Sequence, residues 1–202
     1  MKMITNLKTA LKNPGETRFL KLAVNGELPR ELNHLIHLEE LYLEGNFSEF
    51  DLDLQFFSNL KVLSIKSDNL SQFPASALTV PSLTNLKVLG GRFEFIRLPL
   101  EILSDLKFFT LKNTCVKTLP LEIAQFQNIE EMNLSENKLN DLPLTLCEMK
   151  KLKRLNIDRN EFSVFPEIIK KCDNLRYLSC DGNLFSEKEK ERIQREFNIT
   201  PH

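Results

Sequence analysis

The sequence predicts an α/β solenoid of about eight coils, with a parallel sheet on the concave side and short helices on the convex side. Apolar residues recur every 23 residues, each interval carries a short alternating pattern, and most intervals then contain an apolar residue followed by proline. We expect one domain: residues 1–15 form an N-terminal capping helix, residues 16–185 the coils, and residues 186–202 a C-terminal capping helix.

The capping helix at the N-terminus is expected because Met3, Ile4, Leu7 and Leu11 fall on one helical face, before Asn13-Pro14-Gly15 ends the helix. An amphipathic segment can also meet a membrane surface. The stretch up to Leu11 is short and weakly basic, which favours capping.

The coils are marked by apolar residues at a constant interval. Six of them open at Leu60, Leu83, Leu106, Ile129, Leu152 and Leu175. Each opens an L-x-x-L-x-L pattern, such as Leu152-Leu155-Ile157, and its alternation predicts a strand with one buried face. Two slightly shorter coils precede them, one opening at Leu38 and one marked by Leu20 and Leu22.

A mostly polar position follows each predicted strand. It holds Asn25, Asn46, Asp68, Gly91, Thr114, Asn137, Asn160 and Asn183. A buried amide there both donates to and accepts from neighbouring backbones, so we expect a ladder of asparagines, weaker at Gly91 and Thr114.

Each coil then turns back through a short helix. The apolar-proline pairs are Leu28-Pro29, Phe73-Pro74, Leu119-Pro120, Leu142-Pro143 and Phe165-Pro166. Proline suits a first helical turn because no amide donor is needed there. We expect irregularity in the second coil, which has no proline, and in the fourth, where Leu98-Pro99 comes two residues late, Ile96 takes the buried position, and Gly90 and Gly91 loosen the corner.

The C-terminal cap is predicted by Ser186 and Glu189, which have the form of a capping box. Ile193 and Phe197, four residues apart, would then lay an apolar edge against the last coil. Both ends of the solenoid are therefore expected to be covered.

These patterns resemble the leucine-rich-repeat (LRR) family. The unit L-x-x-L-x-L-x-x-N-x-L-x-x-L-P stands almost complete from Ile129 to Pro143, and the resemblance covers roughly Thr17 to Phe185. The repeats are similar to the 23-residue class common in small bacterial LRR proteins and in plant and animal signalling scaffolds. The resemblance implies a curved solenoid with a concave parallel sheet and names no ligand, because one fold hosts many functions.

Charge and hydropathy narrow the class of partner. A net charge of -1 gives no electrostatic reason to expect nucleic acid. No apolar run approaches the roughly 20 residues that span a bilayer, and the N-terminus lacks the apolar core of a signal peptide. We expect a cytoplasmic protein without membrane insertion, and export to the cell surface or beyond stays open.

The cysteines show no metal-binding spacing. Cys115, Cys147, Cys172 and Cys180 scatter over different faces, which favours four free thiols over disulfides. Cys172 and Cys180 are expected in the core, and Cys115 and Cys147 partly exposed.

We expect no enzyme and no cofactor. The sequence contains no GxSxG, HExxH, GxxxxGK[ST] or GxGxxG motif, and residue 202 follows directly on the predicted cap, which leaves no room for a catalytic domain. His34 and His37 lie three apart on a convex turn and offer half a zinc site, with Glu31 as a third ligand. A solvated pair is the favoured interpretation.

The predicted concave face carries the functional hypothesis. Tyr42, Val62, Leu89 and Phe108 are apolar where water should reach, and we expect them to form one patch beside basic residues. The candidate ligand-binding residues are Tyr42, Val62, Lys66, Lys87, Leu89, Phe108, Lys112 and Arg154.

The expected function is non-enzymatic binding of another protein on that face, by a chain that acts as a monomer. By resemblance, bacterial members often contact host proteins, and signalling proteins are the other partner class. A cytoplasmic scaffold or regulator is the first alternative. A metal protein or enzyme built on His34, His37 or the thiols is the second. A carbohydrate or peptide using Tyr42 and Phe108 also stays open.

Overall fold

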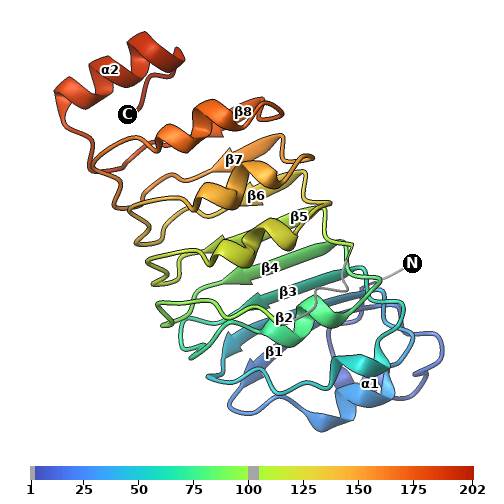
Figure 1. The fold of residues 1–202 in the computed structure, drawn as a ribbon. Coiled ribbons are helices and arrows are strands. Elements are labelled where there is room, and N and C mark those ends of the chain that lie inside the picture. Colours follow the sequence, from blue (N-terminus) through green and yellow to red (C-terminus); the bar gives the residue numbers. More distant parts are fainter. Residues whose placement is uncertain (1–2, 100–104) are drawn as a thin grey trace.

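The computed structural model describes residues 3–99 and 105–202, and its framework is one parallel sheet of eight strands in sequence order (Figure 1). The strands are β1 (Phe19–Asn25), β2 (Glu40–Asn46), β3 (Val62–Lys66), β4 (Asn85–Leu89), β5 (Phe108–Lys112), β6 (Glu131–Asn133), β7 (Arg154–Asn156) and β8 (Tyr177–Ser179). Their order confirms a solenoid in which each coil contributes one strand.

Short 3₁₀ helices line the side opposite the sheet. They are η1 (Arg30–His34), η2 (Leu54–Phe56), η3 (Ala75–Thr79), η4 (Leu121–Gln125), η5 (Leu144–Glu148) and η6 (Glu167–Lys171). Pro29, Pro74, Pro120, Pro143 and Pro166 each stand directly before one of these helices. The coil without a proline has the shortest helix, η2, whose first turn is capped by the side chain of Asp53. The turn expected after Pro99 falls partly on residues 100–104, which lie outside the described residues.

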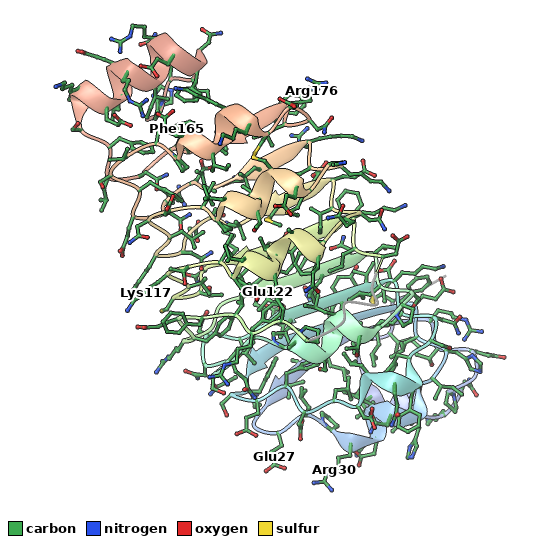
Figure 2. All side chains as sticks on the ribbon, in the orientation of Figure 1. Glu27, Arg30, Lys117, Glu122, Phe165 and Arg176 are labelled. Carbon is green, nitrogen blue, oxygen red and sulfur yellow. A yellow bond between two sulfur atoms is a disulfide. The ribbon has the colours of Figure 1, made fainter. Side chains whose placement is uncertain are left out.

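The core lies between the sheet and the helices. Within one coil, Ile129, Met132 and Leu134 are each at most 2% exposed, and Ile96 is buried as expected. Charged side chains such as Lys117, Glu122 and Arg176 point outward (Figure 2). The alternation in the sequence therefore predicts correctly which residues of the strands face the core.

The asparagine ladder forms only in the C-terminal coils. Asn160 Nδ2 donates to Leu134 O and Ile157 O at 3.0 Å each, and its Oδ1 accepts from Leu139 N at 3.0 Å. Asn137 and Asn183 bind in the same manner. Thr114 donates to Asn137 Oδ1 from its backbone N–H, at 3.1 Å, and from its hydroxyl.

In the first three coils the ladder prediction is wrong. Asn25, Asn46 and Asp68 are exposed. The first two lie inside the longer strands β1 and β2, where Asn25 pairs with Asn46, so neither reaches a buried corner. In the third coil Ser67 bonds the backbone of the preceding coil in place of an asparagine. Its buried hydroxyl donates to Phe47 O at 2.6 Å and accepts from Phe47 N at 3.2 Å.

A left-handed backbone corner also recurs along the C-terminal part. Residues with positive φ at intervals of 23 are Gly90, Asn113, Glu136, Arg159 and Gly182. Only Asn113 and the two glycines are residue types that adopt this conformation readily. The turn at this corner is therefore imposed by the stacking of coils.

The N-terminal cap is smaller than expected. Helix α1 spans Leu7–Ala10, because the side chain of Asn6 accepts from Thr9 N and starts the helix there. Ile4 does not join the helix; it pairs with Leu20, and its backbone bonds Phe19 O and Lys21 N on the open edge of β1. Met3 is exposed, and the first two residues of the expected cap lie outside the described residues.

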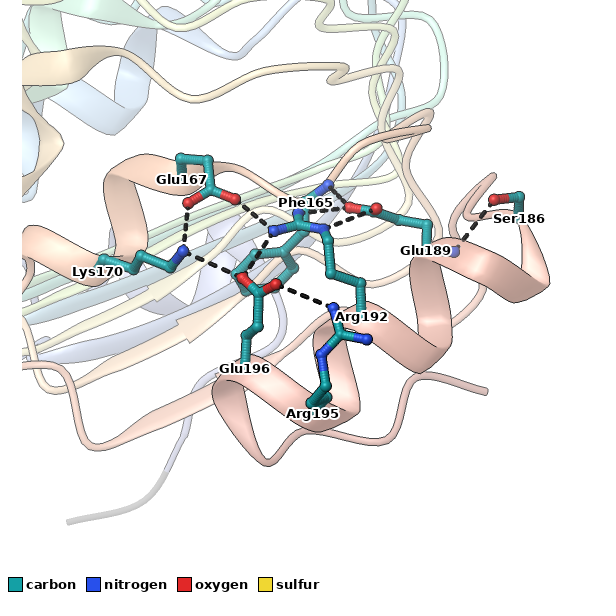
Figure 3. Close-up of polar contacts among 8 residues, drawn as sticks. All are labelled: Phe165, Glu167, Lys170, Ser186, Glu189, Arg192, Arg195 and Glu196. Carbon is teal, nitrogen blue, oxygen red and sulfur yellow. Dashed lines mark hydrogen bonds and ion pairs between the residues drawn. The ribbon is translucent and has the colours of Figure 1, made fainter.

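The C-terminal cap is helix α2 (Glu187–Phe197) (Figure 3). The hydroxyl of Ser186 accepts from Glu189 N at 3.2 Å, whereas the Glu189 carboxylate does not complete the capping box. It accepts instead from Phe165 N, at 2.8 Å, in the preceding coil. Ile193 is fully buried, and the Phe197 ring packs 4.3 Å from that of Phe165.

Cys147 and Cys172 form a disulfide, with their Cα atoms 4.6 Å apart. The expectation of four free thiols is therefore wrong for this pair, as is full burial of Cys172, which is half-buried. Cys147 lies in η5 and Cys172 directly follows η6, so the bridge ties neighbouring helical turns. Cys115 is free and half-buried, and Cys180 is free and buried, as expected.

Candidate protein-binding face

The outward side chains of the sheet form three rows, because the strands are stacked in register. We call this surface the exposed sheet face. The first row is Phe19, Glu40, Val62, Asn85, Phe108, Glu131, Arg154 and Tyr177. The middle row is Lys21, Tyr42, Ser64, Lys87, Thr110, Asn133, Asn156 and Ser179. The third row is Ala23, Glu44, Lys66, Leu89 and Lys112.

The four apolar residues expected to form one patch do not stand side by side. Val62 and Phe108 share the first row with Asn85 between them, Tyr42 is in the middle row, and Leu89 is in the third. Only Tyr42 and Val62 are diagonal neighbours on adjacent strands, and Leu89 is two rows away from Val62 and Phe108. The expectation of a single continuous patch is therefore wrong. Leu89 does lie between two of the expected lysines, Lys66 and Lys112.

The N-terminal part of the face is held by internal contacts. Glu44 pairs with Lys21, at 3.3 Å, and with Lys66 on the other side. The Tyr42 hydroxyl donates to Glu40 Oε2 at 2.8 Å. Burial, followed by this hydrogen bond, raises the pKa of Tyr42 to about 12. These polar groups therefore already have partners within the chain.

The C-terminal part of the face is hollowed by a cavity of about 450 Å³. Three of the expected residues line it: Lys87, Phe108 and Arg154. Lys112 lines an adjoining depression of about 430 Å³. The other expected residues, Tyr42, Val62, Lys66 and Leu89, line neither.

Two exposed aromatic rings line this cavity. Phe108 is 40% and Tyr177 61% exposed. The guanidinium of Arg154 stacks 4.6 Å from the Tyr177 ring centroid, and its Nε lies 3.8 Å from Glu131 Oε1. A stacked arginine beside exposed aromatic rings is typical of residues that dominate the energy of protein interfaces.

Two asparagines on the cavity floor have a fixed orientation. Asn133 Oδ1 accepts from Ser135 N at 3.0 Å, and Asn156 Oδ1 accepts from Asp158 N at 2.9 Å. Both side chains line the cavity. Strict alternation would place Ser135, two residues after Asn133, on the solvent side as well; it is buried instead, because the chain leaves the sheet after Asn133.

Sequence reasoning missed Tyr177, Glu131, Asn133 and Asn156 as site residues. All four were recognisable as outward-facing from the alternation. The signal that could have grouped them is the register between strands. Residues 23 apart stand side by side, which places Tyr177 directly beside Arg154 and Asn133 beside Asn156.

The histidine pair lies apart from this face. His34 is exposed and His37 half-buried, while the residue after each of them, Leu35 and Leu38, is fully buried. In residues 3–99 and 105–202, no three His, Cys, Asp or Glu side chains are grouped so as to hold a metal ion. Over the same residues, no helix has the length and apolar character needed to span a membrane.

Comparison with known proteins supports the repeat architecture. A family model described as a leucine-rich repeat region matches residues 97–196. An LRR protein of Leptospira interrogans has a solved structure similar to this chain, with a TM-score of 0.66 and 29% identity, over 89% of this chain and 51% of that one. A TDR receptor structure has a TM-score of 0.67 at 23% identity, over 82% of this chain and 30% of that one, and shows the fold alone.

Curated relatives match part of this chain. Volume-regulated anion channel subunit LRRC8B of Mus musculus and of Homo sapiens are each 32% identical over 59% of this chain. The probable inactive serine/threonine-protein kinase roco10 of Dictyostelium discoideum is 28% identical over 56% of it. The matched segment spans only 16% of each channel subunit and 4% of the Dictyostelium protein.

Proposed function

This chain is a leucine-rich-repeat protein, and from that premise we propose that it is a non-enzymatic module that binds another protein through the exposed sheet face. The LRR fold is commonly a protein-interaction module. The observation that carries the proposal is the cavity between Phe108 and Tyr177, where exposed rings and the stacked Arg154 leave apolar surface open to solvent.

The physical argument is one of pre-organisation. The sheet holds these side chains in place before any partner arrives, so little conformational freedom is lost on binding. Of the expected binding residues, Lys87, Phe108 and Arg154 are the strongest candidates because they share the cavity. We propose that Lys112 contributes from its rim and that the chain binds as a monomer.

Phe108→Asp tests the proposal. The new carboxylate stays hydrated in the free protein and would be desolvated against an apolar partner surface. Partner capture from the source cell should be lost with this variant and retained with Lys150→Glu, whose side chain is exposed in a loop away from the sheet.

Thermal melts must accompany the capture assay. Phe108→Asp should melt within a few degrees of the wild type, since surface substitutions usually cost about 0.5 kcal/mol or less. A folded Phe108→Asp protein that captures the same partner as the wild type contradicts binding at this face.

A further inference from the structure

The free polar groups in the cavity between Phe108 and Tyr177 are mainly hydrogen-bond donors; an exception is the buried Asn85 Oδ1, an acceptor without a partner among the residues that the structure describes. Asn133 and Asn156 each have their Oδ1 occupied by a backbone N–H of their own coil. Neither Nδ2 has a hydrogen-bond partner among the residues that the structure describes. Because the two residues are cross-strand neighbours, their free amide groups stand on adjacent strands, and neighbouring strands are spaced about 4.8 Å apart.

Two cations accompany these donors. Arg154 lies beside Asn156 on β7, and Lys87 lines the opposite side of the cavity. Across 3–99 and 105–202, Lys87 takes part in no ion pair. The single carboxylate in the lining is that of Glu131, whose Oε1 is 3.8 Å from Arg154 Nε. The cavity therefore has an excess of donors and of positive charge.

We propose, building on the function proposed above, that this cavity receives an acidic side chain of the protein partner. A carboxylate accepts hydrogen bonds and donates none, which matches the free amides of Asn133 and Asn156. Its charge would also strengthen the contact with Arg154.

The two exposed rings in the lining specify which residues stand near that acidic residue in the partner. Phe108 and Tyr177 lie in one row, three strand steps or about 14 Å apart. An extended segment with apolar residues two positions before and two positions after its acidic residue would cover both rings, because these three side chains share one face and span about 14 Å. A neutral or basic residue at the centre would leave the amide donors or the cations without a partner.

The test uses three pentapeptide probes and the side-chain amide signals of Asn133 and Asn156 in NMR spectra. The first is acetyl-Phe-Gly-Glu-Gly-Phe-amide, the second carries Gln in place of Glu, and the third carries Gln with a free C-terminal carboxylate. We expect the Glu probe to shift both amide signals and to bind about ten-fold more tightly than the Gln amide, the ratio given by one charge-assisted hydrogen bond.

Matched variants keep the geometry and change the charge. Asn156→Asp retains the acceptor for Asp158 N, removes the free donor and adds a repelling charge, so binding of the Glu probe should fall at least ten-fold. Glu131→Gln removes the carboxylate that competes for Arg154 within the chain, so binding of the Glu probe should become several-fold tighter. Asn140→Asp adds the same charge at an exposed position off the sheet and should leave binding of the Glu probe unchanged.

Equal binding of the Glu and Gln amides would overturn the inference, as would no shift of the two amide signals with any probe. Tighter binding of the probe with the free C-terminal carboxylate than of the Glu probe would mean that the cavity receives a chain terminus. That result would also overturn the inference. The capture assay with Phe108→Asp separates these results from the proposed function, because it tests partner binding without regard to the partner's charge.

Discussion

Asn137 Nδ2 donates to the carbonyl oxygen of Leu111, 26 residues earlier, at 2.8 Å, and to Leu134 O in its own coil at 2.9 Å. One side chain thus satisfies buried backbone groups of two successive coils. The exposed Asn46 occupies the equivalent sequence position and makes no such contact with the residues that the structure describes; its Oδ1 accepts from the side chain of Asn69 instead.

Asn137→Ala should lower the free energy of unfolding by about 1–3 kcal/mol, since buried carbonyls lose their donor. Asn46→Ala, the matched control, should cost about 0.5 kcal/mol or less. Urea denaturation of both variants measures the difference. Equal losses would mean that the buried ladder contributes nothing particular to stability.

Leu134→Ala should cost about 2–5 kcal/mol, because the side chain is fully buried and its removal leaves a cavity in the core. Leu144→Ala removes the same atoms from a residue that is 75% exposed and should change stability little. Thermal and urea unfolding test the pair. A loss below about 1 kcal/mol at Leu134 would contradict the buried phase of the strands.

Glu189→Ala should destabilise the C-terminal cap by about 1–3 kcal/mol, because the backbone N–H of Phe165 loses its acceptor. Glu189→Gln keeps an acceptor oxygen and should cost less. Glu187→Ala, at a side chain that is 85% exposed, is the control. Urea unfolding ranks the three, and a loss at Glu187 as large as that at Glu189 would contradict the role of the contact with Phe165.

The same carboxylate predicts a pH dependence. The hydrogen bond from Arg192, with a smaller contribution from Phe165 N, lowers the pKa of Glu189 in the folded protein. Its stabilising contribution is therefore present above the unfolded pKa of about 4.3 and is lost as the pH falls through the folded value. The stability difference between wild type and Glu189→Gln should shrink over that acid range; a difference that stays constant would exclude the linkage.

The Cys147–Cys172 disulfide closes a sequence separation of 25 residues, and its removal should cost about 3.5 kcal/mol in the chain-entropy account. Melting with and without dithiothreitol measures this, and the Cys147→Ser/Cys172→Ser protein should not respond to the reductant.

In native alkylation with mass detection, Cys115 should react readily. Cys180 should react slowly, because burial raises the pKa of its thiol to about 12. Rapid labelling of Cys147 and Cys172 without reductant would show that the bridge is absent.

Much of this fold could be predicted from the sequence because the same pattern of apolar residues recurs in successive coils. The 23-residue interval and the alternation of Leu155 with Ile157 locate a strand and its buried face in every regular coil. A single position such as Asn25 cannot be judged by the interval alone. Whether it is buried depends on where its strand ends, and the length of a strand is a tertiary property.

The missed features share another cause: they depend on contacts between coils. Ile4 leaves its helical stripe because the edge of β1 offers hydrogen bonds. Cys147 meets Cys172 because their helical turns are neighbours, at a separation that no linear motif marks. In the candidate site, outward-facing residues were predictable one by one, whereas the grouping of Arg154 with Tyr177 requires the register between strands.

The restriction of the asparagine ladder to the C-terminal coils implies a gradient of local opening along the chain. In a solenoid each coil is stabilised mainly by its two neighbours, so a stretch without ladder contacts opens at lower free energy than one with them. Backbone amides of β1 and β2 should then exchange with deuterium sooner than those of β6 and β7, although their strands are longer. Exchange in the reverse order would mean that the extra sheet hydrogen bonds of the first coils outweigh the missing amide bridges.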